Sequence, residues 1–309
     1  MKTAALIVTT GLDRVSGVAA LLSDVGAISA GQRMISAFQC AGVSLVGLVV
    51  GPENKKAERQ LAQNGVVFLR CEAEKADFFQ GMKLGLSFLR DKFDRVLLVP
   101  GDTPLFLPKT VETLLGSTAN IAVPENRHVN GYPVLLDRKA MDVILAESSF
   151  AAAQRIVQQG NLLIESICVE DSGILLRGSD MTHRKLLIQN HNNQLARPMT
   201  EVTLCNGGPL YDSRLSMLLH LVEDTRSVRD ACSLMQISYS AAWNMLNRVE
   251  DELGFPLVNR IRGGSTGSGS VLTEKGKALM DAYDHFSEHL NIEARNLYSQ
   301  IFEPISKLN

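Results

Sequence analysis

The chain has 309 residues, of which 45% are hydrophobic and 21% charged, and its formal net charge is −2. This composition is typical of a globular protein, and at roughly 100–200 residues per domain the length predicts two domains. The near-neutral charge excludes a globally basic nucleic-acid-binding protein, so any DNA contact must come from a local patch.

No feature of the sequence indicates secretion or insertion into a membrane. The apolar run that begins the chain is too short to span a bilayer, and no cleavage site follows it. The five cysteines are odd in number and widely separated, which indicates neither a disulfide framework nor a zinc site. We therefore expect a cytoplasmic protein.

Short runs rich in Val, Ile and Leu alternate with amphipathic stretches over residues 1–190. The runs predict strands at Ala4–Thr9, Ser44–Val50, Val66–Leu69, Arg95–Val99 and Asn120–Val123, with Tyr132–Leu136 and Leu162–Val169 as further strands at one side. The stretches predict helices around Gln32–Ala41, Ala57–Gln63, Phe78–Leu89 and Pro108–Leu115. This alternation predicts an α/β domain with a Rossmann-like, mostly parallel sheet covered on both faces.

A polar stretch over residues 191–206 predicts a linker, and the chain changes character after it. Leu215, Leu218, Leu219 and Val222 have helical spacing and predict a first helix. Ser227 and Asp230 form a capping box for a short second helix, and Met235–Ser238 is the turn after it. Ser238 caps a longer helix, Tyr239–Leu253, which ends at Gly254. The arrangement predicts a helix-turn-helix.

Residues 256–273 read as a strand, a glycine- and serine-rich loop and a second strand, which is the pattern of a wing. Residues 207–309 are therefore expected to form an α+β winged helix-turn-helix domain. Thr273 caps a long final helix with an apolar stripe formed by Leu279, Tyr283, Phe286, Leu290, Leu297 and Ile301. Because such a stripe can be buried against a second copy, we expect a homodimer.

The second long helix and the wing carry the candidates for DNA contact. They are Ser238, Tyr239, Ser240, Asn244, Asn247 and Arg248 on the helix, and Arg260 and Arg262 at the base of the wing. Hydroxyl and amide groups match base edges, and arginines match phosphates. Trp243 and Leu246 are expected in the core. Residues 207–309 hold 10 Lys and Arg against 13 Asp and Glu, which predicts weak, strongly salt-dependent non-specific affinity.

Five segments of this region carry a specific pattern. They are Ser227-Val-Arg-Asp-Ala-Cys232, Met235-Gln-Ile-Ser-Tyr-Ser-Ala-Ala-Trp243, Glu252-Leu-Gly-Phe-Pro-Leu-Val258, Arg262-Gly-Gly264 and Leu272-Thr-Glu-Lys-Gly276. Through them, residues 210–285 resemble the winged helix domain of the LysR-type and the molybdate-responsive (ModE-like) regulators, and the Ser-Tyr-x-x-Ala-Trp pattern favours the latter. The resemblance implies a bacterial transcription regulator whose partner is double-stranded DNA.

In the N-terminal domain the clearest motif is the apolar strand that runs into Gly101-Asp102-Thr103-Pro104. The carboxyl ends of strands are where α/β sheets bind ligands, and a carboxylate there can hold Mg²⁺ that bridges nucleotide phosphates. A turn or helix-cap aspartate is the alternative interpretation.

Three further segments accompany this motif: Asp77-Phe-Phe-Gln-Gly-Met-Lys-Leu-Gly85, Asn130-Gly-Tyr-Pro133 and Val169-Glu-Asp-Ser-Gly173. Through them, residues 1–188 resemble the molybdenum cofactor guanylyl- and cytidylyltransferases, the MobA-like NTP transferases. The resemblance implies a nucleotide site that includes Gly11, Arg14, Gly81, Lys83 and Gly101, and Mg²⁺ as the cofactor at Asp102.

The catalytic details depart from that family. Val15 and Ala19 or Ala20 stand where the family has an arginine and a lysine, Tyr132 replaces a histidine, and Arg177 stands where an acidic metal-binding residue is expected. Arg14 and Asp180 substitute only after a shift of register. Because these charges stabilise departing pyrophosphate, their loss predicts a degenerate transferase. His128, His183 and His191 lack ligand spacing and are expected on the surface or in loops.

Three hypotheses follow. The favoured one is a regulator linked to molybdenum cofactor or molybdate metabolism, whose transferase domain senses a nucleotide or a molybdopterin-related ligand. The second is an active Mg²⁺-dependent nucleotidyltransferase, using CTP or GTP, fused to a regulatory domain. In the third, which rests on the acidic balance, the winged helix is only a dimerisation module and shows no salt-sensitive DNA binding.

Overall fold

The computed structural model describes residues 1–12, 21–43, 45–51, 55–62, 65–72, 76–160, 162–178, 184–198, 200–264 and 267–306. The chain forms two compact units, Met1–Ala196 and Arg197–Asn309. In the described part of the chain, no helix combines the length and apolar character needed to cross a membrane.

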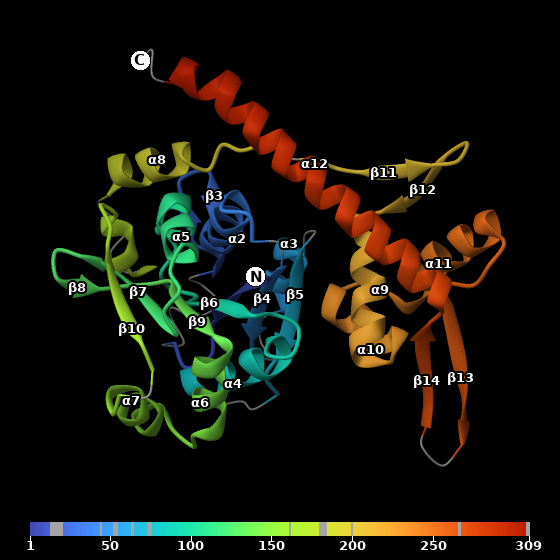
Figure 1. Ribbon diagram of the computed structural model, residues 1–309, viewed down its shortest axis with the longest axis horizontal. Coiled ribbons are helices and arrows are strands. Elements are labelled where there is room, and N and C mark those ends of the chain that lie inside the picture. The colour runs from blue at the N-terminus through green and yellow to red at the C-terminus, as the bar shows by residue number, and fades with distance from the viewer. Residues whose placement is uncertain are drawn as a thin grey trace. The chain divides into compact units, whose positions relative to one another are not determined.

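An eight-stranded sheet forms the centre of the first unit (Figure 1), with the order β10-β7-β9-β6-β1-β4-β5 and β8 paired to β7. The strands are β1 (Thr3–Val8), β4 (Leu45–Val50), β5 (Val66–Arg70), β6 (Arg95–Pro100), β7 (Ile121–Asn126), β8 (Val129–Asn130), β9 (Val134–Asp137) and β10 (Ile164–Cys168). β9 is antiparallel to β6 and β7, and β8 to β7. The other neighbours in the sheet are parallel. The predicted mostly parallel α/β sheet is confirmed.

Helices cover both faces of this sheet. The predicted helices appear as α2 (Ala30–Cys40), α3 (Lys55–Leu61), α4 (Phe78–Leu89) and α5 (Pro108–Leu115). The sequence patterns missed α6 (Arg138–Ala146), α7 (Phe150–Gln158), α8 (Lys185–Asn193), the 3-10 turn η1 (Ser172–Leu175) and the short hairpin of β2 (Asp24–Val25) and β3 (Ile28–Ser29).

The alternation along β1 shows how the faces are divided. Leu6 contacts α4, where a Cβ on Gly85 would lie 2.3 Å from Leu6 Cδ1. Ile7 belongs to the core on the other face, together with Phe38 of α2 and Val111 of α5. Figure 1 shows α2 and α5 on one side of the sheet and α4 and α6 on the other. Because helices cover both faces of the sheet, the ends of its strands remain as the places for a ligand to bind.

The polar stretch that predicts a linker is in part helical, which differs from the expectation. α8 extends through Asn193, and Asn192 accepts a hydrogen bond from Arg33 Nε at 2.9 Å and donates one to Val25 O at 2.7 Å. His191, expected on the surface or in a loop, is only 6% exposed, so this prediction is wrong. These polar side chains form hydrogen bonds with buried protein groups rather than with water. The pattern of polar residues in a sequence does not distinguish these two cases.

The second unit is a winged helix with an added hairpin. Its elements are β11 (Thr203–Cys205), β12 (Pro209–Asp212), α9 (Ser213–Thr225), α10 (Val228–Met235), α11 (Tyr239–Leu253), β13 (Val258–Gly264), β14 (Gly267–Leu272) and α12 (Glu274–Ser306). The predicted helix-turn-helix, wing and final helix are all present. β11 and β12 form an antiparallel hairpin that the sequence patterns did not indicate.

Candidate nucleic-acid interface and nucleotide site

The helix α11 presents one face to the core and the opposite face to solvent. Ser238 caps it by accepting a hydrogen bond from Ala241 N at 3.1 Å, and Gly254 ends it at φ +70°. Leu246, expected in the core, is fully buried, as are Ala242 and Val249. The six DNA-contact candidates of this helix are all exposed: Ser238, Tyr239, Ser240, Asn244, Asn247 and Arg248. At 3.6 residues per turn, Ser240, Asn244 and Asn247 lie on the side opposite the buried residues.

The wing is tied directly to α11. Glu250 Oε1 accepts hydrogen bonds from the amides of Leu257 at 2.6 Å and Val258 at 3.1 Å, where β13 begins. The amide of Ser270, in β14, donates to Arg226 O at 2.8 Å. Carboxylate-to-amide hydrogen bonds of this kind are strong, so the wing has a defined position relative to the helix.

Arg260 of the wing lies over Trp243 of the helix, with its guanidinium carbon 3.9 Å from the ring centroid. Trp243 is partly exposed rather than part of the core, which corrects the sequence expectation. The ring serves as a platform for a cation, and the attraction holds Arg260 beside the exposed face of α11. Arg262 belongs to β13, but its side chain lies outside the described residues.

Arg229 is a cation of this surface that the sequence analysis missed. It is exposed on α10, and its guanidinium carbon lies 5.9 Å from the ring centroid of Tyr239. Arg229, Arg248 and Arg260 thus supply positive charge around the exposed face of α11, although the region as a whole is acidic. The signal lies in the segment Ser227-Val-Arg-Asp230, in which an arginine stands between the two residues of the capping box. Of that capping box, the structure shows the bond from Asp230 N to Ser227 Oγ, at 3.2 Å.

In the first unit, the carboxyl ends of β1 and β6 meet the start of α4. Gly101 N donates to Val8 O at 2.8 Å. Gly11 has φ +69°, and a Cβ there would lie 2.3 Å from Phe78 N. A Cβ on Gly81 would lie 2.0 Å from Thr10 Oγ1, and one on Gly101 2.8 Å from Thr9 Cγ2. The three predicted glycines are thus brought to one place, where each permits close packing of the backbone.

Lys83, the predicted basic residue that the structure describes, is not brought to this place. Lys83 Nζ donates to Glu147 O at 2.7 Å and lies 5.7 Å from the ring centroid of Phe79, which commits the ammonium group to a contact just beyond the end of α6. Arg14 and Asp180, which would substitute for lost catalytic groups, lie outside the described residues.

Asp102 follows β6 and is paired with Arg177. Asp102 Oδ2 lies 3.2 Å from Arg177 Nη1, and Thr103 Oγ1 donates to Asp102 Oδ1 at 3.3 Å. The Asp102 side chain is 8% exposed and that of Arg177 60%. Gly178 N donates to Asp102 O at 2.7 Å, so the two segments are also joined through the backbone.

The charges of both Asp102 and Arg177 affect the pKa of Tyr132. Burial raises the pKa of the Tyr132 hydroxyl, while the positive charge of Arg177 lowers it and the negative charge of Asp102 raises it. Tyr132 N donates to Ile174 O at 3.1 Å, which places the residue beside the segment that leads to Arg177. A tyrosine, a carboxylate and a guanidinium thus come together at the end of β6.

Two family models match the chain. Residues 14–163 match "MobA-like NTP transferase domain" and residues 214–277 match "Bacterial regulatory helix-turn-helix protein, lysR family". The chain carries a MobA-like NTP transferase domain and a LysR-family helix-turn-helix domain.

Relatives of the helix-turn-helix domain are molybdenum-related proteins. The "Molybdenum transport protein ModE" of Azotobacter vinelandii is 32% identical over 96 residues, which cover 28% of this chain and 35% of that protein. The "DNA-binding transcriptional dual regulator ModE" of Escherichia coli K12 is 35% identical over 71 residues, which cover 23% of this chain and 27% of that protein. The chain thus spans between about a quarter and a third of the length of these relatives.

The transferase domain has solved structural neighbours. A nucleotidyl transferase from Methanothermobacter thermautotroptrophicus superposes with a TM-score of 0.52 at 14% identity, over 61% of this chain and 97% of that one. At this identity the likeness shows the fold alone, and the residues of the site must carry any argument about chemistry.

A buried network in the transferase domain, not anticipated from the sequence, holds the segments that carry Asp102 and Arg177. Asp171 accepts four hydrogen bonds: from Leu107 N at 2.7 Å, Thr110 Oγ1 at 2.6 Å, Gly173 N at 2.9 Å and His191 Nε2 at 3.2 Å. Arg33 is fully buried and donates to the carbonyls of Pro104 and Phe106. Burial lowers the pKa of Arg33 to about 10, and the charges of Asp171 and Cys40 oppose that shift.

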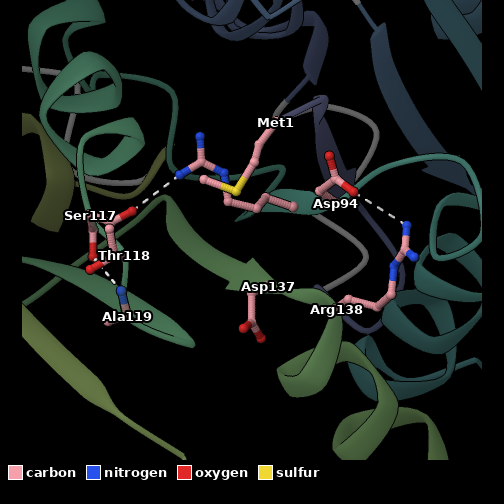
Figure 2. Close-up of a pocket in the computed structure, with 8 residues that line it drawn as sticks. Met1, Asp94, Ser117, Thr118, Ala119, Asp137 and Arg138 are labelled. Atoms are coloured by element: carbon pink, nitrogen blue, oxygen red, sulfur yellow. Dashed lines mark hydrogen bonds and ion pairs between the residues drawn. The ribbon is translucent and has the colours of Figure 1, made fainter.

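A pocket of about 390 Å³ lies at the other end of β6 (Figure 2). Arg95, which lines it, begins β6, whereas Asp102 follows the end of this strand, so the two places are about 20 Å apart. Its charged side chains already have protein partners, such as Asp94 with Arg138 at 3.4 Å and Arg95 Nη1 with Ser117 O at 3.2 Å. This pocket is therefore not the nucleotide site.

Proposed function

We propose that the chain is a bacterial transcription regulator that binds double-stranded DNA through α11 and the wing. The exposed face of α11, with Arg260 held over Trp243 beside it, is the observation that carries the proposal. Hydroxyl and amide groups on such a helix match base edges in the major groove, and arginines at its margin match phosphates. A DNA-binding regulator of this kind acts in the cytoplasm.

The homodimer is part of this proposal, and the exposed apolar side chains of α12 support it. Phe286, Leu290, Leu297 and Ile301 are 50%, 38%, 53% and 54% exposed, whereas Met280 and Tyr283 nearer the start of the helix are buried within the unit. The exposed side chains recur at helical spacing, so a second copy of α12 can bury them. The dimer then places two copies of α11, the recognition helix, on one DNA duplex.

The ligand of the transferase domain is the finer part of the proposal. The printed names of the relatives connect the helix-turn-helix domain with molybdenum, and the transferase match is to a MobA-like domain. We infer that a nucleotide or a molybdopterin-related ligand binds the transferase domain, and that the chain regulates genes of molybdenum cofactor or molybdate metabolism. Such a ligand acts by binding one arrangement of the dimer better than another.

The DNA-binding proposal is tested by selection of duplexes from a random pool with the full chain, followed by affinity measurements between about 50 and 200 mM salt. We expect sequence-selective binding that weakens steeply with salt. Asn244→Ala should relax sequence preference at one position, and the exposed Asn296→Ala on α12 serves as the matched control with unchanged affinity. Failure to select any sequence, with salt-insensitive binding, would support the dimerisation-module hypothesis instead.

The ligand proposal is tested by binding and turnover of GTP and CTP with molybdopterin and Mg²⁺. The Asp102–Arg177 pair predicts binding without release of pyrophosphate. A ligand that binds should also change the affinity of the chain for its selected duplex. Pyrophosphate release would instead establish the alternative, an active nucleotidyltransferase fused to a regulatory domain.

A further inference from the structure

The arrangement around Asp102 does not fit a divalent cation. Mg²⁺ requires near-octahedral oxygen ligands at about 2.0–2.1 Å and is usually held by one or two carboxylates together with substrate phosphates. Here the Asp102 carboxylate faces the guanidinium of Arg177, 3.2 Å away. Within the described ranges, no three or more His, Cys, Asp or Glu side chains are grouped so that they could hold a metal ion by themselves, without a substrate.

Electrostatics favours the guanidinium over the metal at this position. The guanidinium carries one positive charge and the carboxylate one negative charge, so the pair Asp102–Arg177 carries no net charge. A Mg²⁺ bound to Asp102 Oδ2 would be repelled by the nearby guanidinium of Arg177. The carboxylate would also attract the ion less, because Arg177 already neutralises its charge. Asp102 is also almost fully buried, which strengthens its interaction with Arg177 relative to a surface pair.

We propose that Arg177 takes the place of the divalent cation, so that the site binds a phosphate-bearing anion without any metal. A guanidinium suits this role because its planar N–H groups bind phosphate oxygens in pairs. The side chain is 60% exposed, so a ligand in solution can reach it. Asp102 then acts as the group that positions Arg177, and Tyr132 lies beside the pair.

The neighbouring backbone supports a built site rather than a chance surface pair. Gly178 N is bonded to Asp102 O at 2.7 Å, and Asp171 joins the segment before Arg177 to Leu107 and Thr110 after Asp102. These bonds fix the backbone segments that carry Asp102 and Arg177 relative to each other. The inference rests on the proposed ligand-sensing role of this domain and names the chemistry of its ligand.

The first experiment measures Mn²⁺ binding to the full chain by electron paramagnetic resonance. Wild type should bind Mn²⁺ no better than the Asp102→Asn variant. Arg177→Asp, which supplies a second carboxylate, should lower the Kd for Mn²⁺ by about tenfold or more. The gain should disappear when Asp102→Asn is added. Mn²⁺ binding by wild type that is lost in Asp102→Asn would overturn the proposal.

The second experiment measures binding of pyrophosphate, GTP and CTP in EDTA, so that no metal is available. Wild type should bind at least one of these probes, and Arg177→Gln, which keeps a polar side chain but adds no carboxylate, should weaken that binding by about tenfold. The pyrophosphate arm separates recognition of phosphate from recognition of a base. Binding that requires Mg²⁺ and is unchanged in Arg177→Gln would overturn the proposal, even if Arg177→Asp fails to fold.

These readouts are independent of DNA binding. A chain that binds no DNA can still bind an anion without metal, in which case only the proposed regulatory function fails. A chain that binds DNA but holds Mn²⁺ at Asp102 retains the regulatory function and loses this inference.

Discussion

Arg260 and Trp243 form a cation–π pair between the wing and the recognition helix, with 3.9 Å from guanidinium carbon to ring centroid. Such pairs contribute about 0.5–1 kcal/mol at exposed sites. Replacement of Trp243 by Ala should therefore weaken DNA binding about two- to fivefold, because Arg260 loses the platform that orients it. Trp243→Phe keeps an aromatic face and should lose less. Fluorescence anisotropy with the selected duplex measures both.

The salt dependence of DNA binding should show whether Arg260 contacts a phosphate. Arg260→Ala should weaken binding to all sequences alike and reduce the slope of log affinity against log salt by about 1, since one fewer phosphate is neutralised. Arg260→Lys keeps the charge and should keep the slope. An unchanged slope in Arg260→Ala would mean that the wing does not reach the backbone of the DNA.

At the scale of the element, the recognition helix depends on its N-terminal cap. Ser238 Oγ accepts the Ala241 amide at 3.1 Å. Ser238→Ala should destabilise the helix-turn-helix domain by about 1 kcal/mol, because that amide loses its acceptor. Ser233→Ala is the matched control, since Ser233 is exposed within α10 and is not a cap residue, and it should cost less than about 0.5 kcal/mol. Denaturant unfolding measures the difference, and equal losses in the two variants would contradict the capping role.

The packing of α4 against the end of β1 depends on the absence of a side chain at Gly81. A Cβ at this position would lie 2.0 Å from Thr10 Oγ1. Gly81→Ala should destabilise the transferase domain by about 1–3 kcal/mol through overpacking. Gly116→Ala, at the end of α5, would place its Cβ 3.3 Å from Thr113 O and is the milder control. Thermal unfolding should separate the two, and an equal melting temperature would argue against tight packing at Gly81.

At the scale of the whole molecule, the exposed apolar stripe of α12 predicts a dimer. The double variant Leu297→Glu and Ile301→Glu should dissociate the chain to monomers, since charges would have to be buried between the copies. DNA affinity should fall as well, because a monomer engages one half-site only. Glu288→Lys, an exposed charge change on the side of the same helix opposite the stripe, serves as the control. Sedimentation velocity measures the outcome, and a wild-type monomer would contradict the proposed assembly.

Much of the architecture was predictable from local patterns. α4 and α5 begin and end where the amphipathic pattern places them, and Ser238 and Gly254 bound α11 as cap residues require. These features depend on residues within one or two turns of each other, which is the range over which capping and periodicity act. The helices α6, α7 and α8 were missed. In α6 and α8, polar residues such as Asp142 and Asn192 make contacts with residues far away in the sequence.

The sequence by itself determined the alternation of strands and helices over residues 1–115, the caps of the recognition helix and the loss of charged groups from the transferase loop. Only the tertiary structure decided which contacts are made by the residues that replace those of the transferase family. It brings Arg177 to within 3.2 Å of Asp102, across 75 positions of sequence, and it places Arg260 over Trp243. It also turns His191 and Asn192 inward. A pattern records the chemical type of each side chain, but its partner is set by the packing of distant segments, where burial makes each unmatched charge costly.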